Sequence, residues 1–118
     1  MPNWQPNWNN VRWNHFVAEQ AIRALEDAAN LVDDSLSERR RVAYVATAIW
    51  RGRHRQTFDG HFKEIELRSC SLATQLRQKA DEIRRQDVAA YEEQRRRERE
   101  RQRWFAEKHE EDRRGAMG

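Results

Sequence analysis

The sequence contains very few residues that interrupt helices. Only two prolines and four glycines occur among its 118 residues, and both prolines, Pro2 and Pro6, lie near the N-terminus. These are the two residue types that most disfavour a helix interior. Neither occurs from Val11 to Arg51, so nothing local prevents one continuous helix over most of that range.

Cysteine and long hydrophobic runs are also scarce. Cys70 is the single cysteine, so no disulfide can form within one chain. We interpret it as a small, partly buried residue, with a disulfide between two chains as the alternative. No apolar run approaches the roughly 20 residues of a membrane-spanning helix. The first residues lack the charged-then-apolar layout of a secretory signal, so we expect a cytoplasmic protein unless another export route exists.

The sequence offers no recognisable catalytic pattern. We find no glycine-rich phosphate loop, nucleophile elbow or paired carboxylates that would define a pocket. His61 and Glu64 lie three residues apart on a predicted helix, with His54 and Asp59 nearby. Structural zinc normally takes four ligands at recognisable cysteine and histidine spacings, and that pattern is missing. We therefore predict no catalytic residues, no metal site, no cofactor and no enzymatic activity.

Charged residues, by contrast, are abundant and unevenly placed. They make up 36% of the chain, against 37% hydrophobic residues, and the net charge is +3. This composition suits long helices that share a seam better than a closed globule. Residues 19–38 are mainly acidic, whereas residues 39–55 carry six arginines and no carboxylate. Such oppositely charged segments can steer docking of a helical partner with complementary charge, or they can be solvated faces without a binding role.

Two stretches show helical hydrophobic periodicity, from about residue 18 to 49 and from 58 to 83. We expect Asn9 or Asn10 to cap the first helix, and we expect this helix to continue through the arginines at 39–41. Residues 53–57 are expected to form a loop. The second stripe alternates steps of four and three residues, as in an antiparallel helix pair. Its predicted seam consists of Phe58, Phe62, Ile65, Leu72, Leu76 and Ile83.

The tripeptide Trp50-Arg51-Gly52 separates these two stretches. Glycine just past a helix end can adopt the left-handed conformation that terminates the helix. The neighbouring tryptophan supplies a large flat surface to cover the open end of the seam. We therefore predict an all-α fold with a two-helix antiparallel hairpin over residues 13–91.

The two ends of the chain differ from this hairpin. Residues 1–12 form a predicted strap with a tandem Pro-Asn-Trp motif, where proline and asparagine argue against helix. The tryptophans of the strap, together with Trp13, either fold back onto the hairpin or bind in a groove of a partner protein. Residues 92–118 alternate glutamate and arginine. They predict a charged helix that stands free of the hairpin or a disordered tail, with Trp104-Phe105 as a small docking point.

From Trp13 to Tyr91 the sequence resembles the WXG family of small helical-hairpin proteins, which is linked to type VII (ESX) secretion in actinobacteria and other Gram-positive bacteria. Trp50 and Gly52 stand where the turn residues of that family stand, and Phe58 matches a position that is usually aromatic. Leu72, Leu76 and Ile83 continue the second-helix seam. The resemblance implies homo- or heterodimers that form four-helix bundles, and for many members export in the folded state.

One family feature is missing. The export signal is a tyrosine followed four residues later by Asp or Glu, but here Tyr91 is followed by Arg95. Export by a type VII pathway would then depend on a partner that carries the signal, or the protein would stay inside the cell.

We therefore expect a non-enzymatic interaction module that pairs with itself or with a cognate small helical protein and contacts the type VII secretion machinery. The predicted partner interface consists of Trp4, Trp8, Trp13, Phe16, Leu25, Val32 and Leu36. The alternative is a basic helical adaptor that binds nucleic acid or an acidic membrane surface. Nucleic acid is the less expected partner, because the C-terminal arginines are interleaved with glutamates.

Overall fold

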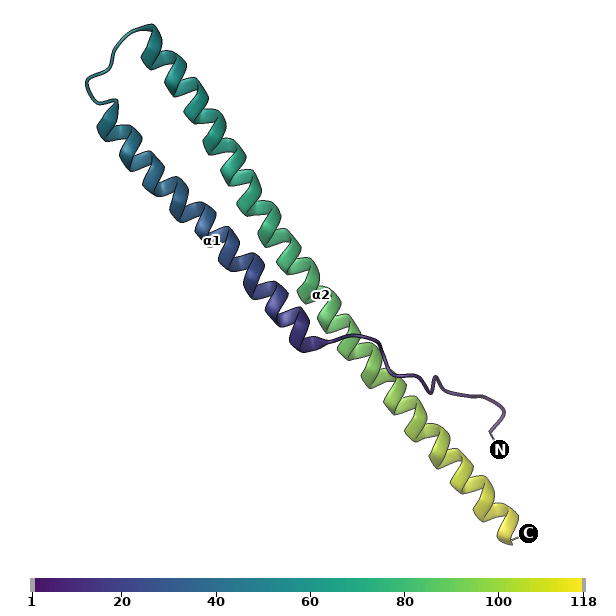
Figure 1. The fold of residues 1–118 in the computed structure, drawn as a ribbon. Coiled ribbons are helices and arrows are strands. Elements are labelled where there is room, and N and C mark those ends of the chain that lie inside the picture. The colour runs from purple at the N-terminus through teal and green to yellow at the C-terminus, as the bar shows by residue number, and fades with distance from the viewer. Residues whose placement is uncertain (1, 118) are drawn as a thin grey trace. The chain divides into compact units, whose positions relative to one another are not determined.

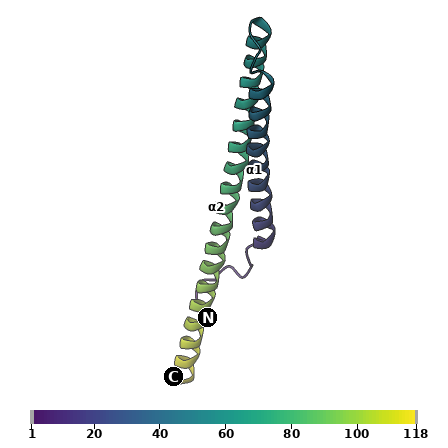
Figure 2. The same cartoon turned by 90° about the vertical axis from the view of Figure 1, so that its left-hand side faces the viewer.

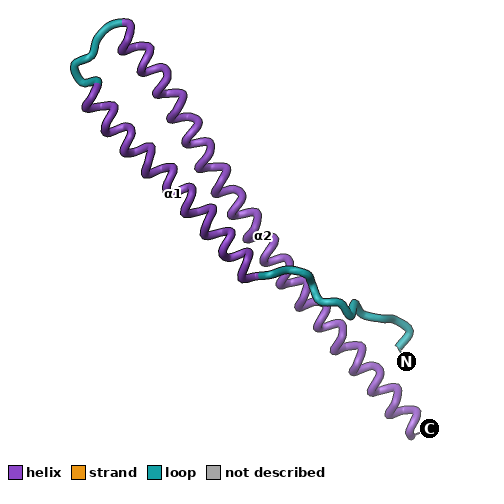
Figure 3. The backbone as a smooth tube through the Cα atoms, viewed as in Figure 1, coloured by secondary structure: helices purple, strands orange, loops and turns teal. Residues whose placement is uncertain are grey.

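The computed structural model describes residues 2–117 and shows two α-helices and no strand within that range (Figures 1 and 3). Helix α1 spans His15–Ala46 and helix α2 spans Arg53–Met117. The prediction of an all-α fold is confirmed. Helix α1 and the first part of α2 run side by side in opposite directions, as in a helical hairpin (Figures 1 and 2).

The helix boundaries differ from those predicted. Helix α1 begins at His15, which makes Asn14 rather than Asn9 or Asn10 the residue that precedes it. Helix α1 ends at Ala46, and Arg53–Thr57 is helical instead of a loop. The predicted continuity of α1 through the arginines at 39–41 is confirmed.

Side chains near the link contact the backbone at the end of α1. The Thr47 hydroxyl donates a 2.6 Å hydrogen bond to the Ala43 carbonyl oxygen, and the Arg55 guanidinium donates to the Thr47 carbonyl oxygen. The backbone N–H groups of Thr47 and Trp50 also donate to these two carbonyl oxygens, each at 3.0 Å, so the side chains add second donors at the end of α1. Gly52 has a φ of +89°, a conformation that glycine adopts at little cost. The chain therefore passes from α1 to α2 within residues 47–52.

The chain divides into two compact units. One comprises Phe16–Arg84, which we call the hairpin unit. The other comprises Met1–His15 together with Arg85–Gly118, which we call the strap unit. These units cut across the ranges expected from the sequence, because the strap and the charged C-terminal stretch fall into one unit.

The interior of the hairpin unit is thin and rich in alanine. Ala29, Ala73 and Ala80 are at most 1% exposed, and the larger Ile22 and Leu36 are also buried. Small side chains let two helices approach closely, but they remove little apolar area from water. Burial of a leucine or isoleucine side chain contributes about 1.5–3 kcal/mol, so this seam provides only modest stabilisation by itself.

Ion pairs cross between the two helices of the hairpin. Arg84 pairs with Glu26 and Arg77 with Asp33, while Arg40 Nη2 lies 3.0 Å from Glu66 Oε2. The acidic half of α1 thus faces arginines of α2, and an arginine of its basic half faces a glutamate. Partly exposed pairs of this kind contribute roughly 0–1 kcal/mol each, so their main effect is to favour this register.

In the strap unit, residues 2–14 follow the C-terminal stretch of α2 without forming a helix (Figures 1 and 3). Pro2 and Pro6 are buried, and Trp104 of α2 is only 5% exposed. Of the two predicted alternatives for the charged stretch, the helix is confirmed, and the strap covers it along one side.

Candidate protein-interaction surface

A row of mostly apolar or small residues, interrupted by Glu38, runs along α1 outside the hairpin seam. Its members follow one another at steps of three and four residues, the spacing of one helix face. Val42 is 51% exposed, Val45 66% and Leu31 70%. We call this row the outer α1 face; it consists of Val17, Ala21, Ala24, Ala28, Leu31, Ser35, Glu38, Val42 and Val45.

Two shallow grooves extend this face toward α2. Leu31 and Ser35 of α1 line the first with Ser69 and Leu72 of α2. Val42 and Ala46 line the second with Phe58 and Phe62. Arg39 lines both grooves. The outer α1 face therefore continues over one side of the hairpin unit, and exposed apolar patches of this kind often mark protein-interaction sites.

Aromatic side chains cover the end of the hairpin next to the link. The Trp50 and Phe58 rings meet edge to face with centroids 5.9 Å apart, and Phe58 stacks on Phe62 at the same centroid distance. Trp50 remains 47% exposed. Trp50 and Gly52 thus lie in the link between the helices, with the tryptophan against the first turns of α2.

Some residues expected at a partner interface lie elsewhere. Leu36 is buried in the hairpin, and Leu25 and Val32 are half-buried on the same row of α1. These three residues follow the buried Ala29 and Ile22 at steps of three and four, so they face α2. The sequence pattern did not separate this row from the neighbouring outer face. Phe16, in contrast, is 65% exposed.

The predicted seam of α2 also needs a correction. Phe58, Phe62, Leu76 and Ile83 are half-buried, but Ile65 is 41% exposed and Leu72 47% exposed. The seam positions beside them are Glu66 and Ala73. A small residue at 73 lets α1 approach closely and turns the larger Leu72 to the flank. Glu66 enters the seam because Arg40 pairs with it.

The strap tryptophans contact α2 within the strap unit. Trp4 Nε1 donates to Glu107 Oε2 at 2.6 Å, and Trp8 meets the Trp104 ring edge to face at 5.2 Å. Trp13 Nε1 donates to Asp87 Oδ1 at 2.7 Å. The structure therefore places the strap tryptophans on α2 of their own chain. In the sequence, the isolated Trp104-Phe105 pair is the feature that could have indicated this contact.

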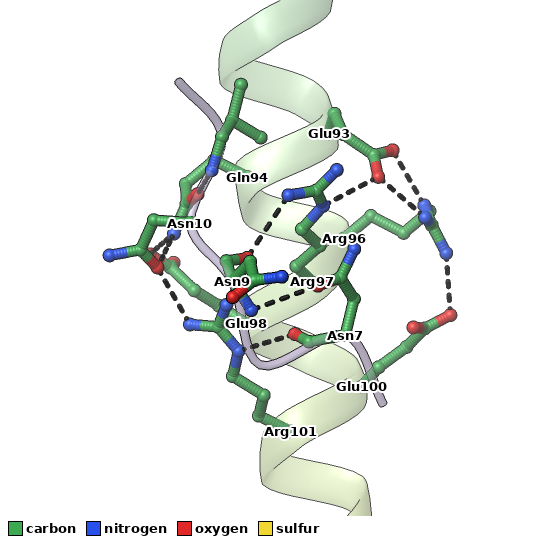
Figure 4. A network of polar contacts seen from close by, with 11 residues as sticks. Asn7, Asn9, Asn10, Glu93, Gln94, Arg96, Arg97, Glu98, Glu100 and Arg101 are labelled. Atoms are coloured by element: carbon green, nitrogen blue, oxygen red, sulfur yellow. Dashed lines mark hydrogen bonds and ion pairs between the residues drawn. The ribbon is translucent and has the colours of Figure 1, made fainter. Parts of the chain in front are cut away.

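Polar side chains of α2 hold the middle of the strap (Figure 4). Arg101 Nε donates to the Asn7 carbonyl oxygen at 2.9 Å, and Arg101 Nη2 donates to the Asn9 carbonyl oxygen at 2.7 Å. Arg97 Nη1 also donates to Asn9 O, at 3.1 Å. Gln94 Oε1 accepts the backbone N–H of Val11 at 2.8 Å. The middle of the strap is thus held through its backbone, while its tryptophans contact α2 through their side chains.

Two carboxylates of α2 support this arrangement. The Asp87 carboxylate accepts hydrogen bonds from His15 and Trp13, and these lower its pKa from the ordinary value. Hydrogen bonds from Arg96 and Arg97 lower the pKa of Glu93 to about 2. Since Arg97 also donates to the strap, Glu93 positions a strap-binding guanidinium (Figure 4).

Tyr91 and Arg95 both lie on α2 in the strap unit and are exposed, Tyr91 by 65%. Tyr91 lines a shallow pocket with Asn10, Val11, Trp13 and Asp87. The position four residues after the tyrosine thus presents a guanidinium to solvent where the family signal has a carboxylate.

Several arginines of the basic stretch already have acidic neighbours. Arg40 pairs with Glu66, Arg41 with Glu38 and Arg55 with Asp59. The hydrogen bond from Arg41 lowers the pKa of Glu38. This local neutralisation weakens the case for a phosphate-binding surface, because counterion release requires accessible positive charge.

Between residues 2 and 117, no three histidine, cysteine, aspartate or glutamate side chains gather as a metal site would require. No helix in this range has the length and apolar character needed to cross a membrane. Comparison with protein-family models, curated proteins and solved structures found no match.

Proposed function

We propose that this protein is a non-enzymatic helical interaction module whose hairpin unit pairs with a second helical hairpin. The observation that carries the proposal is the outer α1 face, where Leu31, Val42 and Val45 are more than half exposed while the hairpin interior is mostly alanine. A second hairpin on this face would bury more large apolar side chains than the hairpin buries alone. A four-helix bundle is the expected product.

The sizes of the side chains on the outer α1 face favour a second copy of the same chain as the partner. The first half of the row holds Ala21, Ala24 and Ala28, and the second half holds Val42 and Val45. If two copies of α1 pair antiparallel, Ala24 meets Val42 and Ala21 meets Val45 of the other copy. Each contact then combines a small and a large side chain, as close packing requires.

The charges beside this face fit the same register. In such a pairing Asp27 of one copy approaches Arg41 of the other, since both flank the row on one side. The acidic half of one α1 would then lie along the basic half of its partner, which favours the antiparallel arrangement over the parallel one. A cognate hairpin with a similar face is the alternative partner.

The arrangement is also what a WXG-type protein requires. Two helices joined through Trp50 and Gly52, with an uncovered apolar face, support the proposal that the chain belongs to this class and acts with type VII secretion. Because Arg95 replaces the acidic residue of the signal, we propose that any export occurs with a partner that carries it.

Size-exclusion chromatography with light scattering tests the pairing. We expect the wild-type chain to elute with twice its monomer mass of 14.3 kDa. Leu31→Arg should shift the protein toward the monomer, because it places a charge at the centre of the paired face.

Leu67→Arg is the matched control, because Leu67 is 62% exposed on the side of α2 away from the seam. This variant should remain dimeric. A wild-type monomer would rule out self-pairing, and failure to bind any helical hairpin encoded nearby would rule out the module itself. Equal dissociation of both variants would show that the outer α1 face is not the interface.

A further inference from the structure

The strap is bound by a ladder of donors on α2. The Trp4, Asn7 and Asn9 carbonyl oxygens accept hydrogen bonds from side chains at positions 104, 101 and 97, respectively. These α2 positions follow one another at steps of three and four, so they lie on one face of the helix. An extended chain that runs along this face presents its carbonyls to these donors, and Arg101 contacts two of them, Asn7 O and Asn9 O.

Aromatic contacts fix one end of the strap. Trp8 meets the rings of Trp104 and Phe105 edge to face, with centroids 5.2 and 5.7 Å apart. The Arg103 guanidinium lies 4.5 Å from the Trp4 ring centroid, and Trp104 Nε1 donates to Trp4 O at 2.9 Å. Such contacts require large flat side chains, so this end of the strap supplies the selectivity.

Polar contacts fix the other end. Asn10 Oδ1 accepts hydrogen bonds from Gln94 Nε2 and Arg101 Nη1, and the Val11 N–H donates to Gln94 Oε1. Trp13 donates to Asp87. The contacts therefore extend along α2 from residue 87 to residue 107, over about six turns of helix.

We propose that this face of α2, residues 87–107, is a binding site for extended peptide segments that carry proline and tryptophan at the spacing of the strap. Residues 2–13 are its intramolecular ligand. The site is independent of the proposed dimerisation, because all of its contacts lie within the strap unit. Release of the strap exposes Trp104, which is 5% exposed beneath it, for another segment of the same chemistry.

The strap is an exchangeable ligand because few of its contacts are deeply buried. Most of the hydrogen bonds that hold it lie at the surface, where each contributes about 0.5–1.5 kcal/mol. The tether compensates for this weakness, since a linked segment acts at an effective concentration in the millimolar range. A free peptide should therefore compete only when the tethered strap is weakened.

The test uses the five tryptophan indole N–H signals of the full-length, 15N-labelled protein. Trp8→Ala weakens the strap by removing the contacts to Trp104 and Phe105. We expect the signals of Trp4, Trp13 and Trp104 to shift, whereas the signal of Trp50, which lies in the hairpin unit, stays in place and reports that the fold is intact. Trp8→Phe keeps an aromatic ring and should shift them much less.

A synthetic peptide of residues 2–14 is then added to the Trp8→Ala protein. We expect the wild-type peptide to return the Trp104 signal toward its wild-type position, and the peptide with Trp8→Ala to leave it unchanged. Unchanged strap signals in the Trp8→Ala protein would overturn the proposal, as would no recovery with the wild-type peptide. Equal recovery with a scrambled peptide would show that the face has no preference and would also overturn it.

Discussion

The hairpin unit and the strap unit use α2 in different ways. In both, the less exposed residues of α2 follow one another mainly at steps of three and four. In the hairpin unit this row is largely apolar, with Ala73, Leu76 and Ala80 among its members. In the strap unit it is largely polar, with Gln94, Arg97 and Arg101.

The nature of the partner explains this difference. Helix α1 satisfies its own backbone hydrogen bonds, so the α2 face that it contacts needs only apolar side chains that fit. The strap has no helical hydrogen bonds, and its carbonyl groups must find donors when α2 covers them. Arginine supplies several donors on one planar group, and a single residue such as Arg101 therefore contacts both Asn7 and Asn9.

The largest effect is expected from a cavity in the hairpin seam. Leu36 is 4% exposed, so Leu36→Ala should lower the free energy of unfolding by about 2–5 kcal/mol. Leu67→Ala removes the same atoms from an exposed site and should change the free energy of unfolding by less than about 0.5 kcal/mol. Chemical denaturation followed by circular dichroism measures both. Similar losses in the two variants would mean that the seam does not stabilise the hairpin.

Smaller effects on stability are expected at two glycines, and the two substitutions should act in opposite directions. Gly52→Ala should destabilise the protein by about 1 kcal/mol, because φ is +89° there and a side chain disfavours that conformation. Gly60→Ala, inside α2, should stabilise by up to about 1 kcal/mol, because alanine is the better helix former. Neither added methyl group would meet a neighbour within 4 Å. Thermal unfolding midpoints that move in the same direction would contradict this interpretation.

The smallest effect is a local response to acid in the strap unit. The folded-state pKa values of Asp87 and Glu93 are lowered, so each carboxylate stabilises the strap unit above its unfolded pKa. This contribution is lost as the pH falls, for Glu93 between about 4.5 and about 2. The indole signal of Trp13 should therefore shift in acid before that of Trp50.

The matched control for this response is Asp87→Asn, which removes one of the two carboxylates. Its Trp13 signal should already differ at neutral pH and should respond less to acid. A Trp13 signal that is independent of pH down to 2 in the wild-type protein would show that these carboxylates do not hold the strap.

The sequence predicts the helices well because their apolar periodicity is strong. It also indicates the link, where Gly52 is the one glycine between the two periodic stretches. The helix boundaries escape prediction because periodicity does not register contacts across the link, such as that of Arg55 with the Thr47 carbonyl oxygen, and α2 begins at Arg53, before the periodic stretch. The choice between Leu72 and Ala73 at the seam depends on how closely α1 approaches, which periodicity does not encode.

The docking of the strap could not be predicted for a different reason. Alternating glutamate and arginine, as at residues 96–101, is typical of a solvated helix, and the pattern is the same whether the arginines contact water or carbonyl groups. Only Trp104 and Phe105 stand out from this background. Their partner, Trp8, lies 96 positions away in the chain, and no local pattern connects the two.

The backbone contacts of the strap have a consequence for how its sequence can change. Arg97, Arg101 and Trp104 contact carbonyl oxygens, which every amino acid possesses. Substitution of an exposed side chain such as that of Asn3 should therefore be tolerated. Insertion or deletion of a single residue between Trp4 and Val11 would move the carbonyls out of phase with their donors, so the strap is constrained in length as well as at its tryptophan positions.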